Sequence, residues 1–241
     1  MSRLFALISA DARNIRRDSM MMLILAAPVI FILLLRYAIP WLAGTIQQEL
    51  AFDLTPHYEI IFIFFSLLLP MLFGMITGFI LLDEQDEHIF TFISVTPLSK
   101  TGYLLQKLTI STTIIFIVTL VFAVINGLTS VPFWRFTPIA LLMALEAPIM
   151  ALFLVAFAEN KVEGIALSKV SGLFLFAPLA GYFVHSPLQY LAGISPTFWI
   201  WESYAAAVEG SALLVLNLAA GVTLHLCYLL LLWRKFVRKA I

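Results

Sequence analysis

The chain has 241 residues, of which 62% are hydrophobic and only 12% are charged, and its formal net charge is zero. A soluble domain carries about a quarter charged residues, so this much apolar surface cannot be buried in one soluble core, and lipid must solvate most of it. The balanced charge argues against nucleic acid as a partner. The composition therefore predicts an all-α integral membrane protein embedded in a lipid bilayer.

The first nineteen residues form a basic segment in which apolar residues such as Leu4, Phe5 and Ile8 are interspersed with arginines at positions 3, 13, 16 and 17. This pattern predicts an amphipathic interfacial helix over residues 1–19, lying on the cytoplasmic membrane surface. We expect no cleavable signal peptide, because the apolar run that starts near residue 20 is as long as a full span.

Six apolar runs follow, and each is about long enough to cross a hydrocarbon core of ~30 Å. The predicted spans are residues 20–41, 60–82, 104–125, 138–158, 169–184 and 212–233. The fifth run is a little short and is interrupted by Pro178. Residues 185–211 are too polar and broken for a span, so we expect short re-entrant or interfacial helices there, on the extracytoplasmic side.

Basic residues set the orientation, because cytoplasmic loops of membrane proteins are enriched in Lys and Arg. With six spans and both ends inside, all of the 14 Lys and Arg residues except Arg36 and Arg135 fall on the cytoplasmic side. The sequence therefore predicts a multi-pass protein of the inner (cytoplasmic) membrane, with both termini cytoplasmic.

The segment 83–100 follows the second span and begins with the acids Asp83, Glu84, Asp86 and Glu87. An apolar stripe over residues 89–95 follows, and Pro97 cannot continue a helix because it lacks the amide donor. On a helix, the acids would face water while the stripe faced lipid or neighbouring helices. From periodicity alone, an ordinary connecting loop fits as well as a surface helix that receives force from a partner.

A family resemblance favours the second interpretation. The acids, the apolar stretch, Val95-Thr96-Pro97-Leu98-Ser99 and then Lys107 resemble the coupling segment of the permease subunits of type-2 ABC exporters, including bacterial drug-export permeases. Two further patches, residues 158–164 and residues 195–199, are similar to that family and occur in its order. The chain departs from many members at His88, where they have Gly, and at Thr91, where they have an acid.

The resemblance implies a single permease domain over residues 1–241, which forms a translocation path as a dimer with a second copy or a paralogous permease. A separate cytoplasmic ABC ATPase would drive alternating access by pushing on the coupling segment. Asp83, Glu84, Asp86 and Glu87 would contact that ATPase, and Thr96 and Pro97 would fix the turn that transmits its motion. The implied cargo is a hydrophobic drug, a peptide or a lipid-like molecule, moved outward.

The sequence lacks the chemistry of an ATPase or another enzyme. It contains no Gly-Lys-Ser or Gly-Lys-Thr, so we expect ATP and Mg to be bound by the partner and no cofactor by this chain. Its four histidines share no metal-ligand spacing. The alternative is a stand-alone secondary transporter or intramembrane enzyme, but no internal repeat or nucleophile motif is visible. A neighbouring gene for a free ATPase would separate the two hypotheses.

Glu146 lies within the predicted fourth span, where a charge costs about 2.5–3.5 kcal/mol on insertion scales. It is either an acid that lines the translocation path or a hydrogen-bonded brace near Pro148, and the sequence does not choose between them. Gly74 and Gly78 form a small-x-x-x-small pair, which allows close helix packing within the subunit or at a subunit interface. The single cysteine, Cys227, is expected to be a small packing residue.

Overall fold

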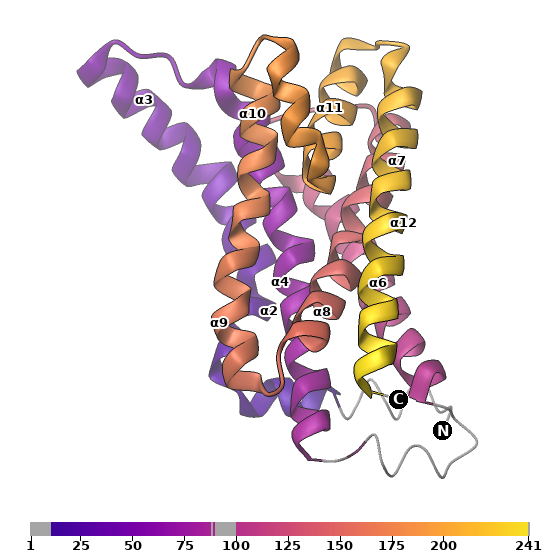
Figure 1. Cartoon of the computed structure of the whole chain (residues 1–241). Helices are drawn as coiled ribbons and strands as arrows, with labels where there is room; N and C mark the ends of the chain where they lie inside the picture. Colours follow the sequence, from indigo (N-terminus) through magenta and orange to yellow (C-terminus); the bar gives the residue numbers. More distant parts are fainter. Residues whose placement is uncertain (1–10, 88, 90–99, 241) are drawn as a thin grey trace.

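The computed structural model describes residues 11–87, 89 and 100–240, and within these ranges every regular element is helical. Six helical units are long and apolar enough to cross a membrane, which confirms the predicted number of spans. They run side by side along one long axis (Figure 1). Their bounds are Ser19–Leu50, Thr55–Asp86, Lys100–Ile125, Phe133–Phe157, Lys161–Phe183 and Leu213–Lys239.

The first unit follows a short helical stretch at residues 11–17. It consists of α2 (Ser19–Leu33), a π-helical turn (Leu34–Ala38) and α3 (Ile39–Leu50), which leans away from the bundle (Figure 1). The Asp18 side chain caps α2 by accepting hydrogen bonds from the backbone N–H groups of residues 20 and 21. The π turn lies just before Pro40, whose missing N–H removes one bond from the regular helical ladder.

The centre of the bundle is formed by α4 (Tyr58–Asp86) and by α7 (Phe133–Ala144) with α8 (Glu146–Phe157). In the apolar windows of the second and fourth units, 67% and 78% of residues are buried, against 11–28% in the other four. The side chains of the inner units are therefore surrounded mainly by other helices. The outer ones present apolar side chains on the outside of the bundle, as lipid-facing helices do.

The outer helices are α2, α6 (Lys100–Ile125), α12 (Leu213–Ala240) and the pair α9 (Lys161–Ser171) and α10 (Ala177–Phe183). A 3₁₀ turn at Gly172–Phe176 joins α9 to α10, so the fifth unit begins eight residues before the predicted start at 169. Asn160 caps α9 by accepting from the N–H of Glu163 at 3.0 Å. The predicted start was too late because the polar residues of this first helical turn resemble a loop.

The region 185–211 contains a 3₁₀ helix (Pro187–Ile194) and α11 (Pro196–Glu209). Figure 1 shows α11 beside α10, α7 and α12, and its aromatic side chains Phe198, Trp201 and Tyr204 are buried. Helix α11 therefore forms part of the packed interior at one end of the bundle, whereas the 3₁₀ helix buries none of its residues.

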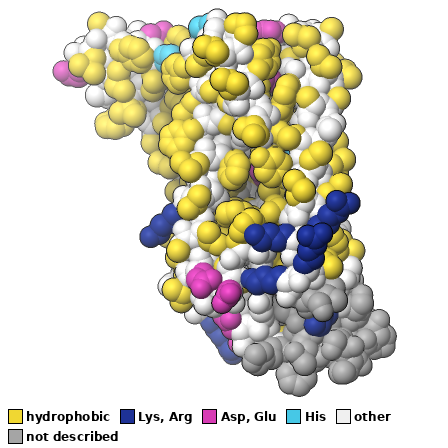
Figure 2. Space-filling model, viewed as in Figure 1, with side chains coloured by type: hydrophobic (Ala, Val, Ile, Leu, Met, Phe, Trp, Pro, Cys, Tyr) yellow, Lys and Arg dark blue, Asp and Glu magenta, His cyan; other side chains and the backbone are white. Residues whose placement is uncertain are grey.

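The opposite end, which we call the terminal end, carries both described ends of the chain. Asp11 contacts Lys107 at the start of α6, and Lys239 near the end of α12 donates to the carbonyl oxygens of Val155 and Ala158. Figure 2 shows Lys and Arg gathered toward this end of the visible face, with mostly hydrophobic side chains along the rest of it.

Candidate functional site

At the terminal end, the ammonium group of Lys161 joins three helical segments. Its Nζ donates to Asp83 Oδ2 at 2.7 Å and to Asp18 Oδ2 at 2.9 Å. The hydrogen bond from Lys161 lowers the pKa of Asp18 below its ordinary value, because it stabilises the charged carboxylate. Lys161 on α9 therefore links the end of α4, through Asp83, to the start of α2, through Asp18.

A second and more deeply buried cluster surrounds Lys107 on α6. Its Nζ lies 2.5 Å from Glu84 Oε1 and 2.9 Å from Asp11 Oδ1, and the Tyr103 hydroxyl donates to the same Glu84 oxygen at 2.6 Å. Lys107 is 3% exposed and Glu84 is 6% exposed. The expectation that Glu84 faces water is therefore wrong: it lies on the face of α4 that contacts α6, where a buried cation offsets its charge.

The remaining residues expected to contact an ATPase are differently placed. Asp86 and Glu87 are exposed at the end of α4, as expected for acids that face water. Thr96 and Pro97 lie outside the described residues. Asp83 and Glu84 are thus paired with lysines, while Asp86 and Glu87 are exposed, and Asp86 Oδ2 also accepts a hydrogen bond from the Lys161 N–H at 3.5 Å.

Glu146 is the first residue of α8, directly after a break in the fourth unit at Leu145. The break has a local cause, because Pro148 lacks the N–H that would bond to the carbonyl four residues earlier. Glu146 is 5% exposed, and its Oε1 lies 3.2 Å from Nε2 of His225, which is completely buried on α12.

The other ring nitrogen of His225 fixes the chemistry of this pair. Nδ1 lies 2.7 Å from the carbonyl oxygen of Gly221, which can only accept, so Nδ1 carries a hydrogen. Within the described residues, Glu146 Oε1 and His225 Nε2 approach each other to 3.2 Å, but neither atom forms a hydrogen bond of ordinary geometry. Both are therefore buried polar atoms with unused hydrogen-bonding capacity.

A cavity of about 180 Å³ adjoins this pair, and we call it the Glu146 cavity. Its walls are mainly aromatic and Met side chains, including Phe153, Phe157, Phe174, Tyr228, Met71 and Met150. The structure therefore places Glu146 on the wall of a cavity and also gives it a buried partner. Its role on a translocation path, or as a brace near Pro148, stays a prediction.

Gly74 and Gly78 both lie against α8 within the same subunit. A Cβ added to Gly74 would lie 2.4 Å from the backbone oxygen of Ala147, and one added to Gly78 would lie 2.8 Å from Leu154 Cδ1. Real Cβ atoms do not approach backbone oxygens so closely, so only glycine fits at position 74. The pair sets the spacing between the two central units.

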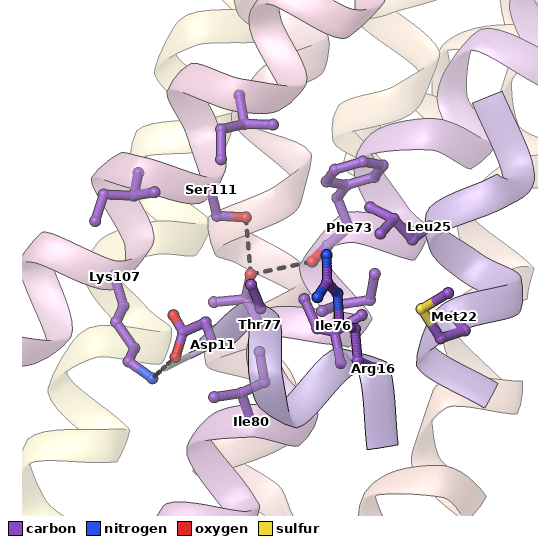
Figure 3. Close-up of a pocket in the computed structure, with 14 residues that line it drawn as sticks. Asp11, Arg16, Met22, Leu25, Phe73, Ile76, Thr77, Ile80, Lys107 and Ser111 are labelled. Atoms are coloured by element: carbon purple, nitrogen blue, oxygen red, sulfur yellow. Dashed lines mark hydrogen bonds and ion pairs between the residues drawn. The ribbon is translucent and has the colours of Figure 1, made fainter. Parts of the chain in front are cut away.

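A larger cavity of about 480 Å³ opens between the residue 11–17 helix, α2, α4 and α6, and we call it the lateral cavity (Figure 3). Asp11, Arg16 and Lys107 lie on its lining, together with the hydroxyls of Thr77 and Ser111, whose oxygens are 2.8 Å apart. The rest of the wall is apolar and includes Met22, Leu25, Phe73, Ile76, Ile80 and Ile114.

Sequence reasoning did not identify Asp11, Asp18, Lys107, Lys161 and His225 as members of these clusters. The available signal was the occurrence of charged or imidazole groups within or beside apolar runs, which require partners in a membrane. Their pairing could not be read, because each contact joins helices whose relative rotation the sequence does not specify. The part of the chain that the structure describes contains no group of three or more potential metal ligands.

A comparison with known protein families matches residues 11–233 to the family described as "Rv2686c-like: Fluoroquinolones export permease protein Rv2686c-like". The chain is 27% identical over 236 residues to the fluoroquinolones export permease proteins Rv2686c and MT2760 of two Mycobacterium tuberculosis strains, H37Rv and CDC 1551. Each alignment covers 95% of this chain and 92% of the relative. No solved structure matches the chain.

Proposed function

We propose, from the premise that this chain belongs to the Rv2686c-like fluoroquinolones export permease family, that it is the membrane-spanning subunit of an ATP-driven drug exporter. The observation that supports the proposal is the extent of the family match, which covers residues 11–233 and so includes the first five spans and most of the sixth. The relatives are named as permeases that export fluoroquinolones, so we propose a drug of that class as cargo.

A separate cytoplasmic ATPase would supply the energy. The sequence has no phosphate-binding loop, so ATP and Mg would be held by that partner. Asp86 and Glu87 stand exposed beside the segment that resembles an ABC coupling region, and they offer negative charge to a docking protein. The ATPase would bind at the terminal end, which would then be cytoplasmic, in agreement with the Lys and Arg gathered there.

Two permease subunits would enclose the path, either two copies or this chain with a paralogue. The outer faces of α2, α6, α9–α10 and α12 are apolar and suit lipid, and part of this surface would instead contact the second subunit. Glu146 would lie on the path, where its carboxyl group would meet a polar or cationic group of the cargo, with His225 3.2 Å away.

The buried Glu146–His225 pair is also an observation that favours the alternative, a stand-alone carrier driven by protons, because such carriers use intramembrane acids and histidines as relays. The energy source distinguishes the two. We would express the chain in a drug-sensitive bacterium with and without an ABC ATPase encoded beside it, and measure accumulation of a fluoroquinolone.

The proposed function predicts that accumulation falls only when the ATPase is present. In inverted vesicles, uptake should require ATP and be abolished by vanadate. Export by this chain alone that is stopped by a protonophore and is indifferent to vanadate would replace the ATP-driven exporter with the carrier.

A further inference from the structure

We infer that the lateral cavity is a binding site for a drug-sized amphipathic carboxylate, in which Arg16 holds the carboxylate and the apolar wall holds the ring system. Fluoroquinolones have this chemistry, since each carries a carboxylate on a flat ring system. The inference rests on the proposed function for the identity of the cargo and adds the place where the chain holds it.

Size is the first argument. Pockets that bind drug-sized molecules occupy about 300–1,000 Å³, and the lateral cavity measures about 480 Å³. The Glu146 cavity, at about 180 Å³, holds only part of such a molecule. A hollow of about 580 Å³ between α6, α8 and α12 also has drug size, but its lining carries no charged side chain, whereas the lateral cavity combines drug size with a cation.

Charge is the second argument. Lys107 contributes little free positive charge to the cavity, because its Nζ is already bound by Glu84 and Asp11. Arg16 is exposed, and within the described residues it forms no ion pair. Figure 3 shows its side chain among the residues that line the cavity. A guanidinium fork matches the two oxygens of a carboxylate, so Arg16 favours a ligand with a carboxylate over one with an uncharged group at that position.

The middle of the wall offers a further polar contact. Thr77 Oγ1 lies 3.1 Å from the carbonyl oxygen of Phe73, to which its hydrogen can donate, and 2.8 Å from Ser111 Oγ. When Thr77 donates to Phe73, the hydrogen of Ser111 is free to turn toward Thr77 or toward a ligand. A carbonyl group on the ring system of the ligand can accept that hydrogen.

The cavity also has an entrance suited to an amphipathic ligand. Met22, Leu25 and Ile114 lie on its lining and are each 43–44% exposed on the outside of the bundle. A molecule partitioned into the membrane can therefore reach the apolar wall from the side while its carboxylate stays near Arg16, at the terminal end.

Binding can be measured without the ATPase, with the purified chain in nanodiscs of phosphatidylcholine. Ciprofloxacin is the carboxylate probe, and its methyl ester is the probe without the anion. We expect Arg16→Gln to weaken ciprofloxacin binding by about five- to tenfold and to leave ester binding unchanged, because one partly exposed charged hydrogen-bonded pair is lost. Arg17→Gln is the matched control, since Arg17 is exposed but does not line the cavity.

A second pair of variants tests the apolar wall. Ile114→Trp fills the cavity and should weaken binding of both probes, whereas Ile117→Trp, three residues further along α6 and outside the lining, should weaken neither. If wild type binds neither probe, or if Arg16→Gln and Ile114→Trp behave like their controls, the inference is overturned.

The same holds if Arg16→Gln leaves both drug affinities unchanged and instead lowers retention of phosphatidylglycerol, which would make the cavity a lipid site. Failure of the proposed function has a different signature. It appears as absence of ATPase-dependent export by the wild-type chain, whatever the chain binds.

Discussion

Lys107 Nζ lies 2.5 Å from Glu84 Oε1, and both side chains are almost completely buried between α4 and α6. Removing one member of such a pair leaves the other charge buried with too few partners, which costs about 3–5 kcal/mol. We therefore expect Glu84→Ala to lower the free energy of unfolding by roughly that amount, measured by thermal unfolding in detergent.

The matched control is Glu87→Ala, which removes an exposed acid from the same helix end and should change stability by less than about 0.5 kcal/mol. The double variant Glu84→Leu/Lys107→Met removes both charges and should recover much of the loss. A single Glu84→Ala variant as stable as Glu87→Ala would show that the pair does not stabilise the fold.

Asp18 makes the second prediction, which concerns pH. Its pKa is lowered in the folded chain by the hydrogen bond from Lys161, so its contribution to stability is present above the unfolded pKa and is lost as pH falls through the folded pKa. Asp18→Asn keeps an N-cap but removes the charge. Wild type should melt at a higher temperature than Asp18→Asn at pH 6, and the difference should begin to shrink below about pH 4, the unfolded pKa, and vanish only below the lower folded pKa. A difference independent of pH would contradict this role.

The third prediction separates the two roles of Glu146. Glu146→Gln removes the acid but keeps hydrogen-bonding atoms near His225, so membrane yield should be preserved while export of the drug falls about tenfold or more. Glu146→Leu removes the polar group that lies 3.2 Å from the buried Nε2 of His225, which costs about 1–3 kcal/mol, and should lower yield as well. Yield and export are measured in the assembled complex. Full export by Glu146→Gln with loss of yield by Glu146→Leu would make the acid purely structural.

The fourth prediction concerns the contact between α4 and α8. Gly74→Ala places a methyl group against a backbone oxygen that cannot move away alone, so we expect a loss of about 1–3 kcal/mol in the free energy of unfolding. Gly44→Ala on α3 is the control, because a Cβ there meets nothing within 4 Å and replacing Gly in a helix is stabilising by up to about 1 kcal/mol. Equal stability of the two variants would show that α8 does not need this close approach.

The fifth prediction tests coupling. Asp86→Ala/Glu87→Ala removes two exposed charges, so insertion should be normal while co-purification of the ATPase weakens, increasingly at higher salt. Pro97→Ala removes no charge and should bind the ATPase yet export poorly, if residues 96 and 97 fix the turn that the family resemblance implies. If both variants keep full binding and full export, the segment after α4 is only a connector.

The number and placement of the spans could be predicted because each apolar run must satisfy its own backbone within the membrane, which is a property of the local sequence. The start of the fifth span was missed for an equally local reason. Lys161 and Glu163 resemble loop residues, but Asn160 caps the helix and Asp83 and Asp18 neutralise the lysine.

The clusters could be anticipated only in part. Glu146 was recognised as costly in a membrane, but its partner His225 lies 79 positions away on another helix. Glu84 was misplaced because four acids within five residues suggest contact with water, and only the rotation of α4 against α6 shows which of them is buried. Burial of a charge depends on which faces of two helices meet, and periodicity within one helix does not contain that information.

A single helix separates the two cavities: Phe73 and Thr77 of α4 line the lateral cavity, and Met71 lines the Glu146 cavity. Any rotation of α4 about its axis therefore reshapes both walls at once, so the volumes of the two cavities are not independent variables. A ligand bound in one cavity stabilises the rotation of α4 at which it binds best. By thermodynamic reciprocity, an event elsewhere that favours a rotation of α4 changes the binding free energy of that ligand by the same amount as the ligand changes the free energy of that event.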